Sequence, residues 1–443
     1  MARILFINPA WGGRVSRRGA RHNRRWPPLD LLNCAALARA QGHRVALADA
    51  RALPYRGEDL RRLAARADMV FLTSSPLDRW QCPNLEVERL WELARGLEHP
   101  RLVLLGAHGT LLPARSLAAS RAWALVVGEP EGPVAELAAG RPRRRVRGLA
   151  YVQDGEVVFT PPARPVELEA LPLPAFDLAP PHRYRYEVLG SHLALLETGR
   201  GCPFACAFCL KVMYGPGVRH KSVPRVLEEV RRVKALGARH LYFMDLEFTL
   251  RRGRTLELCA ALARAGLGLE WACQCRADTV DRELLRTMRE AGCRLVHFGL
   301  ESGSPRMLER LGKGITPEQV IRALAEARRA GLRTACFVMF GFPGETRRDM
   351  EATLELVRRL PADLCSFHLA TPYPGTRLGE DCPGLEPFCE YDAVHHRREV
   401  LAAYRRRGYR AFYGRPSRLL RLALGLGPRL CGEGARLLLG MAR

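Results

Sequence analysis

Residues 199–209 read GRGCPFACAFC, a short stretch that combines three cysteines with two glycines and a proline. Cys202, Cys206 and Cys209 stand in it at the spacing C-x3-C-x2-C, directly after an apolar run that predicts a strand, Ala194–Thr198. Three thiolates that converge from one loop can hold a soft metal ion or an iron–sulfur cluster. A cubane [4Fe–4S] cluster takes four ligands, so three cysteines leave one iron open, as in a catalytic metal centre.

A structural zinc site and a ferredoxin-type cluster both fit these cysteines less well. A structural zinc site usually pairs two C-x2-C units that lie far apart, and Cys273-x-Cys275 is a poor second half. Ferredoxin-type runs have a different spacing and a trailing proline. Cysteines placed by chance are not expected at the end of a strand. The pattern therefore favours a cluster with an open iron, and the other eleven cysteines are expected to be buried as small apolar side chains.

Short apolar runs alternate with helical patterns over the second half of the chain, from Ala194 to about Pro374. Six strands are predicted there: Ala194–Thr198, His240–Met244, Glu270–Cys275, Leu295–Leu300, Thr334–Phe340 and Leu364–Ala370. Helices are expected between them, for example at Val223–Leu236, Arg282–Ala291 and Pro317–Ala330. Six βα-type repeats, instead of eight, indicate a partial (β/α)6 barrel or an open curved parallel sheet.

The first 140 residues show the same α/β alternation. The predicted strands are Ile4–Asn8, Val45–Ala48, Met69–Thr73, Leu102–Gly106 and Ala124–Val127. Continuous apolar strands separated by helices, such as Leu29–Gln41 and Val87–Leu97, indicate a Rossmann-like parallel sheet covered on both faces. Such sheets bind ligands at the carboxyl ends of their strands. Small, polar and glycine residues stand there in this chain: Asn8-Pro9, Thr73-Ser74-Ser75, Gly106-Ala107-His108 and Gly128-Glu129-Pro130.

A hairpin and a proline-rich stretch separate the two halves. The hairpin is predicted from Leu149–Gln153 and Val157–Thr160, with a turn at Asp154-Gly155. The stretch from Pro161 to Pro181 predicts a linker that fixes the spacing of two domains. The expected domains are a Rossmann-like domain at 1–140, the hairpin and linker at 141–187, the partial barrel at 188–377 and a basic helical C-terminal region at 378–443.

The net charge of +24 and the pI near 10.2 first suggest a nucleic-acid-binding protein. Most of this charge belongs to three arginine clusters, at residues 14–25, 141–147 and 395–443, so the rest of the chain is nearly neutral. Nucleic acid is therefore an unexpected partner. Between Tyr404 and Leu426 arginines alternate with leucines and aromatics. This pattern suits a helix on an anionic membrane surface or a helix packed on the barrel, and both stay open.

The chain has no window near the roughly 18 consecutive apolar residues of a membrane span. Arg3 is followed only by the short apolar run Ile4–Ile7, which is not a secretory leader. The sequence therefore predicts a cytoplasmic protein, with peripheral contact to the inner membrane surface through the C-terminal region as an option.

The part of the chain from about Leu195 to Thr376 resembles the radical S-adenosylmethionine (SAM) superfamily. The fingerprint of that family, C-x3-C-x-aromatic-C, follows the first strand of a partial (β/α)6 barrel, and Phe208 fills the aromatic position here. In that family the open iron binds the amino and carboxylate groups of SAM. Reductive cleavage then yields a 5′-deoxyadenosyl radical that abstracts hydrogen from an unactivated carbon. The resemblance implies an external one-electron reductant such as flavodoxin or ferredoxin.

Two further family motifs concern the amino acid part of SAM. Residues 242–249, YFMDLEFT, resemble the motif that ends the second strand beside the SAM amino group. Asp245 matches that motif, but its second aspartate is replaced by Leu246, and Glu247 is the substitute that the resemblance suggests. Arg276, in the sequence CRAD, matches the arginine that faces the SAM carboxylate. A guanidinium is suited to that role because it binds a carboxylate through two parallel hydrogen bonds.

Two more family motifs concern the nucleoside part of SAM. Residues 299–304, GLESGS, match the fourth-strand segment, and the resemblance places Glu301 and Ser302 at the ribose hydroxyls. Residues 340–346, FGFPGET, match the fifth-strand loop, which places Gly341 near the adenine.

The N-terminal domain resembles the cobalamin-binding domain that precedes many radical SAM proteins. The matching segments are Asn8-Pro9, Pro27-Pro28-Leu29, Gly42-His43, Gly106-Ala107-His108-Gly109-Thr110 and Gly128-Glu129-Pro130-Glu131. Ser74, at the end of the third strand, is grouped with Asn8, Pro9, Gly106, His108 and Gly128 as a cobalamin contact. The chain lacks the motif D-x-H-x-x-G, so no histidine is marked as a lower ligand of cobalt. His108 is either a ligand or a loop histidine that hydrogen-bonds its neighbours.

The favoured prediction is a cobalamin-dependent radical SAM methyltransferase that acts on an unactivated carbon of a lipid-like or natural-product substrate. The linker would then set the open edge of the N-terminal sheet against the mouth of the barrel. Two alternatives stay open. One is a radical SAM enzyme without bound cobalamin that performs rearrangement, cyclisation or C–C coupling. The other is a zinc-stabilised, basic nucleic-acid-binding protein.

Overall fold

The computed structural model describes residues 1–10, 25–84, 87–215, 217–382, 398–416 and 418. The chain divides into two compact units. Unit 1 comprises Met1–Tyr186, Ser191–Cys202 and Leu210–Arg239, and unit 2 comprises Glu187–Gly190, Pro203–Cys209 and His240–Arg443. Residues 191–202 and 210–239 thus pack with the N-terminal half, whereas the sequence places them with the barrel.

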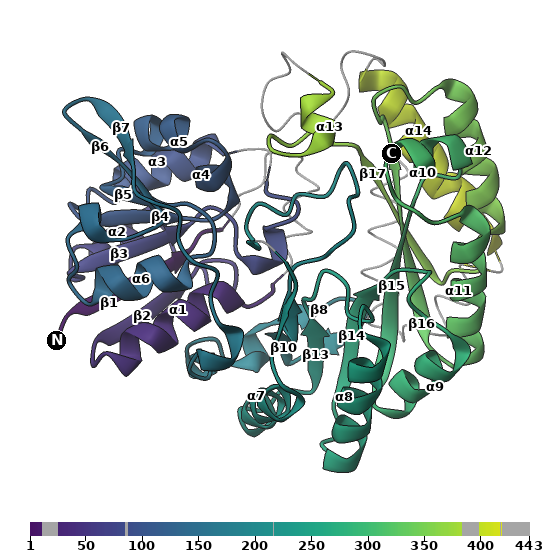
Figure 1. The fold of residues 1–443 in the computed structure, drawn as a ribbon, viewed down its shortest axis with the longest axis horizontal. Coiled ribbons are helices and arrows are strands. Elements are labelled where there is room, and N and C mark those ends of the chain that lie inside the picture. The colour runs from purple at the N-terminus through teal and green to yellow at the C-terminus, as the bar shows by residue number, and fades with distance from the viewer. Residues whose placement is uncertain (11–24, 85–86, 216, 383–397, 417, 419–443) are drawn as a thin grey trace. The chain divides into compact units, whose positions relative to one another are not determined.

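Unit 1 is built on a seven-stranded sheet in the order β2-β1-β3-β4-β5-β6-β7 (Figure 1). Its strands are β1 (Arg3–Asn8), β2 (Arg44–Asp49), β3 (Met69–Thr73), β4 (Leu102–Leu105), β5 (Ala124–Val126), β6 (Leu149–Gln153) and β7 (Glu156–Phe159). Strands β1 to β5 are parallel, as predicted, and β6 and β7 are antiparallel. The hairpin β6–β7 forms where it was predicted, but it extends this sheet, whereas the sequence groups it with the linker.

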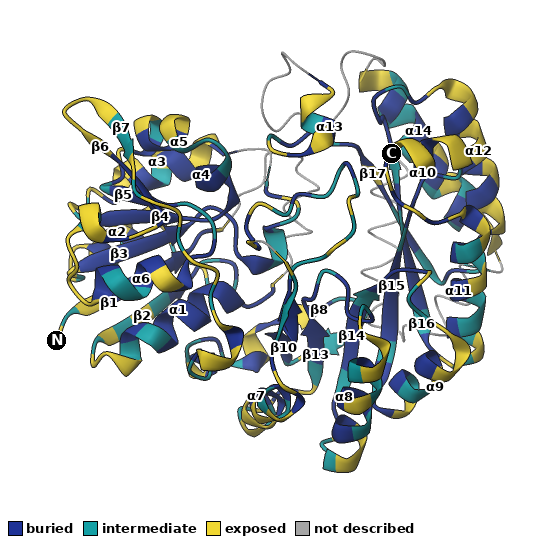
Figure 2. Cartoon of the chain, viewed as in Figure 1, coloured by how far each residue is buried: buried dark blue, intermediate teal, exposed yellow. Residues whose placement is uncertain are grey.

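Helices cover both faces of this sheet because its strands are apolar on both sides. Phe6 packs with α1 and α6 on one face, and Leu5 packs with α2, α3 and α5 on the other. These helices are α1 (Leu29–Ala40), α2 (Gly57–Ala64), α3 (Glu88–Gly96), α5 (Pro113–Ser120) and α6 (Glu131–Ala138). Strands β1, β3, β4 and β5 are accordingly buried along nearly their whole length, while the outer helix faces are exposed (Figure 2).

The proline-rich segment is tied to unit 1 by specific contacts. Tyr184 donates through its hydroxyl to Asp49 Oδ2, at the end of β2, at 2.8 Å. The backbone nitrogen of Ala175 donates to the carbonyl oxygen of Leu32, on α1, at 3.1 Å. These hydrogen bonds fix the segment and the residues that follow it to the rest of unit 1.

Unit 1 also contains shorter elements and one further long helix. They are η2 (Leu77–Arg79), α4 (Ala107–Leu111), η3 (Arg143–Arg145), η4 (Leu168–Ala170), η5 (Phe176–Leu178), η6 (Pro181–Arg183), β8 (Arg185–Tyr186), β10 (Leu193–Leu196), β11 (Gly199–Arg200), β12 (Arg219–His220) and α7 (Val223–Ala235). The two-residue strand β9 is Gly190–Ser191. Strand β10 is the first of the six strands predicted for the second half of the chain.

Unit 2 contains the other five predicted strands, in the order β13-β14-β15-β16-β17. They are β13 (His240–Phe243), β14 (Glu270–Cys275), β15 (Cys293–Glu301), β16 (Arg333–Phe340) and β17 (Leu364–Leu369). Every neighbouring pair among them is parallel. The alternating α/β pattern of the sequence therefore predicted these strands correctly.

The helices of unit 2 begin at capping residues that the sequence provides. Thr316 and Thr346 each form a capping box, with Gln319 and Asp349 respectively, which satisfies backbone donors of the first turn. The helices are α8 (Arg252–Ala265), α9 (Arg282–Glu290), α10 (Pro305–Arg310), α11 (Pro317–Arg329), α12 (Arg347–Arg359), α13 (Arg377–Glu380) and α14 (Arg398–Tyr413).

Helix α14 packs on β17, the outermost strand of this order. The hydroxyl of Tyr413 accepts from Cys365 N and donates to Cys365 O, both at 2.9 Å. The hydroxyl of Tyr409 accepts from Phe367 N at 3.4 Å. For residues 398–413 the structure thus supports a helix packed on the barrel over a helix that lies on a membrane surface. The leucine-rich stretch from 419 onward and the arginines at 14–24 lie outside the described residues.

Within the described ranges, every helix is too short or too polar to span a lipid bilayer.

Candidate active site

The three motif cysteines lie on a loop that follows β11 and begins at Gly201. Gly201 has a φ of +93°, and a Cβ atom built on it would lie 2.0 Å from the carbonyl oxygen of Gly217. Only glycine fits this close approach. The Lys211 ammonium donates to the carbonyl oxygen of Cys202 at 3.2 Å. The backbone is therefore fixed immediately before and at the first cysteine.

Cys202, Cys206 and Cys209 are each partly exposed, and none of the three is in a disulfide. Thiols of this kind suit a cluster because ligand cysteines must give up their protons when the metal binds. Among the residues that the structure describes, no three His, Cys, Asp or Glu side chains are already arranged as a metal site. The donor set fits an iron–sulfur cluster, and its assignment to these three residues stays a prediction.

The other described cysteines are mostly packing residues. Eight are buried, as predicted: Cys34, Cys259, Cys273, Cys275, Cys293, Cys336, Cys365 and Cys382. Cys82 is the exposed exception. Cys273 and Cys275 lie on β14 with their sulfur atoms 3.7 Å apart, and burial raises the pKa of both thiols. Thiols that keep their protons are poor zinc ligands, which argues against a zinc site that uses this pair.

Backbone hydrogen bonds fix the turn 206–209 within unit 2. Ala207 N donates to Leu311 O at 2.8 Å, and Ala207 O accepts from Leu378 N at 2.9 Å. Leu311 follows α10 and Leu378 belongs to α13, so the turn is held between two helix ends. Phe208, the aromatic residue of the motif, packs against the apolar cluster that contains Ala207, Leu311 and Leu378.

Arg276 stands just after β14, and its guanidinium is held by several contacts. Its Nε and Nη2 atoms donate to the two carboxylate oxygens of Asp278 at 2.9 and 2.8 Å, and Nη2 also donates to Lys313 O at 2.8 Å. The guanidinium carbon lies 3.6 Å from the ring centre of Phe204. Its Nη1 atom lies 3.9 Å from the sulfur of Cys206. A fixed positive charge thus stands beside a thiol whose metal-binding form is anionic.

Lys313 and Glu301 form a buried ion pair at the end of β15. Gly299 makes room for this pair, because a Cβ atom there would lie 2.2 Å from Glu301 Oε1 and 2.8 Å from Lys313 Nζ. Glu301 has a φ of +68°, which is uncommon for a residue with a side chain. Burial disfavours the charge of Lys313, but the Glu301 carboxylate, the hydrogen bond to it and the nearby Cys206 together hold the pKa of Lys313 above its usual value. The hydrogen bond from Lys313 to Glu301 fixes the two side chains against each other.

Asp245 and Glu247 follow β13, and both are buried. Glu247 Oε1 accepts three hydrogen bonds, from Thr249 N at 3.1 Å, from Thr249 Oγ1 at 2.5 Å and from Thr279 Oγ1 at 2.9 Å. Burial raises the pKa of Glu247. These contacts give Glu247 a local role in the turn, so Asp245 is the stronger candidate for the SAM amino group.

Ser302 and Gly341 occupy buried turns after β15 and β16. Ser302 Oγ lies 3.3 Å from Thr353 Oγ1 and accepts from Ser304 N at 3.2 Å. Gly341 has a φ of +92°, and its backbone nitrogen donates to Glu345 Oε2 at 2.6 Å. Burial raises the pKa of Glu345 to about 7. Side chains beneath these turns therefore fix both backbones, and the Ser302 hydroxyl is engaged within the protein.

Four rings form a row across the strands of unit 2. Tyr242 on β13, His297 on β15, Phe337 on β16 and His368 on β17 follow one another with ring centres 5.7, 5.4 and 6.3 Å apart. Phe337 is partly exposed and His368 is exposed. None of the four was singled out in the sequence. Tyr242 and His297 are buried, so only Phe337 and His368 offer ring surface to a bound organic molecule.

Ser74, Gly106 and Gly128 come together at the carboxyl ends of β3, β4 and β5 in unit 1. Gly106 has a φ of +103°, and a Cβ atom there would lie 2.8 Å from Ser74 Oγ. Thr110 Oγ1 donates to Gly106 O at 3.1 Å and accepts from Gly128 N at 3.0 Å. Ser74 Oγ is buried without a hydrogen-bond partner in the described part of the chain. An unused buried hydroxyl fits an edge that binds a polar ligand.

Asn8, Pro9 and His108 are buried as well, but the two polar side chains have partners inside the protein. Asn8 Nδ2 donates to Asp49 Oδ1 at 2.9 Å, which ties β1 to β2. His108 Nε2 lies 2.7 Å from the carbonyl oxygen of Asn84, and burial lowers the pKa of His108 to about 4. His108 is thus hydrogen-bonded to its neighbours, as the loop-histidine alternative expects.

Two charged residues near the motif cysteines were missed as site residues. Lys313 carries no family motif, although it is one of only four lysines among 70 basic residues, and that rarity is a usable signal. Arg200 lies inside the quoted stretch, yet nothing in the sequence shows that its side chain is buried among carboxylates.

Comparisons with known proteins agree with this geometry. The model of the radical SAM superfamily matches residues 196–357. A Pyrococcus horikoshii protein described as an uncharacterized methyltransferase is 32% identical over 419 residues, which cover 89% of each chain. The anaerobic magnesium-protoporphyrin IX monomethyl ester cyclase of Rubrivivax gelatinosus is 28% identical and is covered over 70% of its length, against 86% of this chain.

A solved structure has a similar fold. It is TsrM from Kitasatospora setae, a radical SAM methyltransferase with cobalamin and a [4Fe–4S] cluster bound. The TM-score is 0.69 at 21% identity, and the match covers 87% of this chain and 79% of that one.

Proposed function

This chain belongs to the radical SAM superfamily, and we propose that it is a cobalamin-dependent methyltransferase acting on an unactivated carbon of a lipid-like or natural-product substrate. The observation that carries the proposal is the cysteine motif beside Arg276, in a chain whose first unit is a Rossmann-like sheet with a polar ligand edge. A relative that covers most of both chains is described as a methyltransferase. The similar structure of TsrM contains cobalamin as well as the cluster.

The proposed cluster ligands are Cys202, Cys206 and Cys209. When bound there, a [4Fe–4S] cluster supplies the electron that cleaves SAM. Arg276 places a positive charge 3.9 Å from the sulfur of Cys206, which complements the charge that this residue would carry as a ligand. Phe208 packs the turn against the apolar cluster beneath it, which holds the turn in place.

The proposed SAM contacts are the residues of the family motifs that lie at the ends of the strands. Asp245 would accept from the amino group, and Arg276 would face the carboxylate. Glu301, oriented by Lys313, would accept hydrogen bonds from the ribose hydroxyls. Gly341 would lie near the adenine, on a backbone that Glu345 holds and that packs against Leu401 of α14 where a side chain would otherwise stand. No general base is required of these residues.

Cobalamin is proposed to bind at the edge of unit 1 formed by Ser74, Gly106 and Gly128. The unpartnered hydroxyl of Ser74 and the close approach at Gly106 support this choice. His108 is not assigned to cobalt, because the chain lacks the motif D-x-H-x-x-G that marks a lower ligand. Cobalamin would carry the methyl group at this edge.

The substrate is proposed to contact the ring row of unit 2, where Phe337 and His368 are the accessible members. Radical SAM enzymes take a small-molecule substrate and an external reductant. A flavodoxin or ferredoxin is proposed as that reductant. Contact of residues 419–443 with a membrane surface is proposed from their arginine and leucine pattern, which would give access to a lipid-like substrate.

A second function within the family is supported by the Rubrivivax gelatinosus relative, which is described as a cyclase. In this case the chain would use the cluster and SAM without cobalamin, for cyclisation, rearrangement or C–C coupling. Membership of the radical SAM superfamily argues against the zinc-stabilised nucleic-acid-binding protein.

Anaerobic reconstitution with iron, sulfide and cobalamin tests the proposal. We expect retained iron, a bound-cobalamin absorption spectrum, and transfer of an isotope-labelled methyl group from SAM to a candidate lipid, measured by mass spectrometry. Deoxyadenosine formation by protein that retains no cobalamin and transfers no methyl group would favour the second function.

Variants test the cluster ligands separately. Cys202→Ala, Cys206→Ala and Cys209→Ala should each lose the iron, whereas Cys82→Ala, which removes an exposed thiol, should retain it. Full iron content in the triple variant would refute the ligand assignment.

A further inference from the structure

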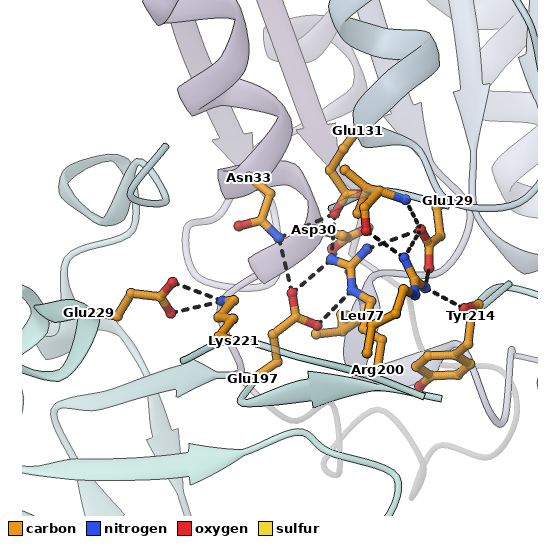
Figure 3. A network of polar contacts seen from close by, with 12 residues as sticks. Asp30, Asn33, Leu77, Glu129, Glu131, Glu197, Arg200, Tyr214, Lys221 and Glu229 are labelled. Carbon is orange, nitrogen blue, oxygen red and sulfur yellow. Dashed lines mark hydrogen bonds and ion pairs between the residues drawn. The ribbon is translucent and has the colours of Figure 1, made fainter. Parts of the chain in front are cut away.

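A network of buried charges in unit 1 surrounds Arg200, two residues before the first motif cysteine (Figure 3). The Arg200 side chain is fully buried, and its Nε and Nη2 atoms donate to the two carboxylate oxygens of Glu197, both at 2.8 Å. Nη2 also donates to Glu131 Oε1 at 2.5 Å, and Nη1 lies 3.8 Å from Glu129 Oε2. Three buried carboxylates thus converge on one guanidinium.

Other side chains of unit 1 hold these carboxylates in place. Asn33, on α1, donates to Glu131 at 3.2 Å and to Glu197 at 3.4 Å. Arg219, on β12, donates to Glu129 at 3.0 Å. The network therefore joins α1, the first turn of α6, β11 and β12 (Figure 3).

The composition of this network is poorly suited to stability alone. Removing charged groups from water is costly, and apolar side chains of similar volume often stabilise a protein as well or better. What a bidentate guanidinium–carboxylate pair provides in addition is a fixed direction, because two parallel hydrogen bonds orient both groups. A network of this kind is therefore suited to setting the position of the backbone that carries it.

The backbone that carries Arg200 leads directly into the cysteine loop. Gly201 follows, and its close approach to Gly217 O leaves no room for a side chain. Cys202 comes next. The position of Cys202 is thus set by a short backbone segment whose one buried side chain is held by the network.

We infer that Arg200 is a positioning residue, which Glu131 and Glu197 hold so that Cys202 has a fixed place relative to the carboxyl end of β5. Glu131 is the first residue of α6 and follows closely after Gly128, which belongs to the proposed cobalamin edge. The inference rests on the proposed function and adds a connection, within unit 1, between a cluster ligand and the edge proposed for the second cofactor.

Three variants and one matched control test this role. Arg200→Met removes the charge, Arg200→Lys keeps the charge without the two-pronged donor, and Glu131→Gln keeps an acceptor oxygen without the charge. Asp78→Asn is the control, because it breaks a buried ion pair of the same unit, with Arg51, that includes no residue of the cysteine loop. Each protein is reconstituted anaerobically. The readouts are the rate of iron loss to a chelator, the EPR spectrum of the reduced cluster with and without SAM, and Tm.

We expect Arg200→Met to lose iron at least about 10-fold faster than the wild type and to give a broadened EPR spectrum, since supporting residues of metal ligands commonly matter by about 10–100-fold. The iron-loss rates of Arg200→Lys and Glu131→Gln should lie between those of the wild type and Arg200→Met. Asp78→Asn should lower Tm yet retain the wild-type iron-loss rate and EPR spectrum.

Either of two results would overturn the inference. One is iron loss from Asp78→Asn as fast as from Arg200→Met at an equal fall in Tm, because general destabilisation would then suffice. The other is a wild-type iron-loss rate and spectrum in the Arg200 variants. If Arg200→Met does not fold, Arg200→Lys and Glu131→Gln decide by the same comparison. Methyl transfer by the wild type is measured separately, so its absence would count against the proposed function and not against the role of Arg200.

Discussion

Lys313 Nζ lies 2.9 Å from Glu301 Oε1, and the two side chains are only 9% and 8% exposed. The pair joins Glu301, the last residue of β15, to Lys313, which comes twelve positions later in the sequence. Because Glu301 is the proposed acceptor for the ribose hydroxyls, the lysine both neutralises and orients that acceptor.

Replacing Lys313 by Met should lower the free energy of unfolding by about 3 kcal/mol, because a buried carboxylate loses its partner. It should also weaken SAM binding, since Glu301 is no longer oriented. Denaturant titration and equilibrium SAM binding measure the two effects. The double variant Lys313→Met/Glu301→Gln should regain part of the stability but none of the SAM affinity. A double variant as unstable as the single one would contradict the role of the unpaired charge.

Arg276→Lys should reduce SAM affinity by about 10-fold, or about 1.4 kcal/mol. A lysine cannot donate to both oxygens of Asp278 while it lies flat on Phe204 and directs a third nitrogen toward Cys206. SAM binding to reconstituted protein is the measurement. The matched control is Arg252→Lys, which changes an exposed arginine bonded to surface carboxylates. Equal effects of the two substitutions would argue against a special role of Arg276.

Gly201→Ala should largely abolish iron loading. The new methyl group would lie 2.0 Å from the Gly217 oxygen, and the φ of +93° is unfavourable for alanine, so the backbone before Cys202 must move. Iron content after reconstitution reports this effect. Gly237→Ala is the control, with a φ of +88° and nothing within 4 Å of the new atom. It should cost about 1 kcal/mol of stability and leave the iron content as it is.

Glu345 should make stability fall as the pH rises. Its pKa is about 7 in the folded protein, against an ordinary value of 4.5, because burial disfavours the charged form. From pH 4.5 upward the unfolded chain loses this proton while the folded protein keeps it until about pH 7. The free energy of unfolding therefore falls by about 3 kcal/mol between pH 4.5 and about pH 7 because of Glu345, and this residue lowers it no further above that pH.

Glu345→Gln isolates this effect from other titrating groups. The amide oxygen can still accept from Gly341 N, but the side chain no longer ionises. The difference in unfolding free energy between the variant and the wild type should grow in favour of the variant from pH 4.5 to pH 7. A difference that is constant over this range would show that the carboxyl titrates normally.

The strands and most helices could be predicted because their signals are local. Continuous apolar runs predicted β1, β3 and β14 nearly to the residue, and Thr316 with Pro317 predicts the start of α11 from neighbouring residues alone. The pairing of a hairpin is a different matter. The turn at Asp154-Gly155 predicts β6 and β7, but nothing within that segment says that β6 lies beside β5.

The candidate sites divide in the same way. Cys202, Arg276 and Glu301 could be assigned because family motifs keep them at recognisable spacing. The partners that hold them could not, since Glu131 and Arg200 are 69 positions apart and meet only after folding. Glu247 shows the opposite case. It stands at a suitable motif position, but its carboxylate accepts hydrogen bonds from Thr249 and Thr279, which the motif does not reveal.

The tyrosines of α14 matter beyond the helix itself. Their hydroxyls occupy backbone groups of Cys365 and Phe367 that an outermost strand would otherwise offer to a foreign strand. A preparation truncated before Arg398 would leave those groups bare and invite strand addition between molecules. Aggregates from such a truncated protein would reflect the missing cover and would carry no information about the assembly of the intact chain.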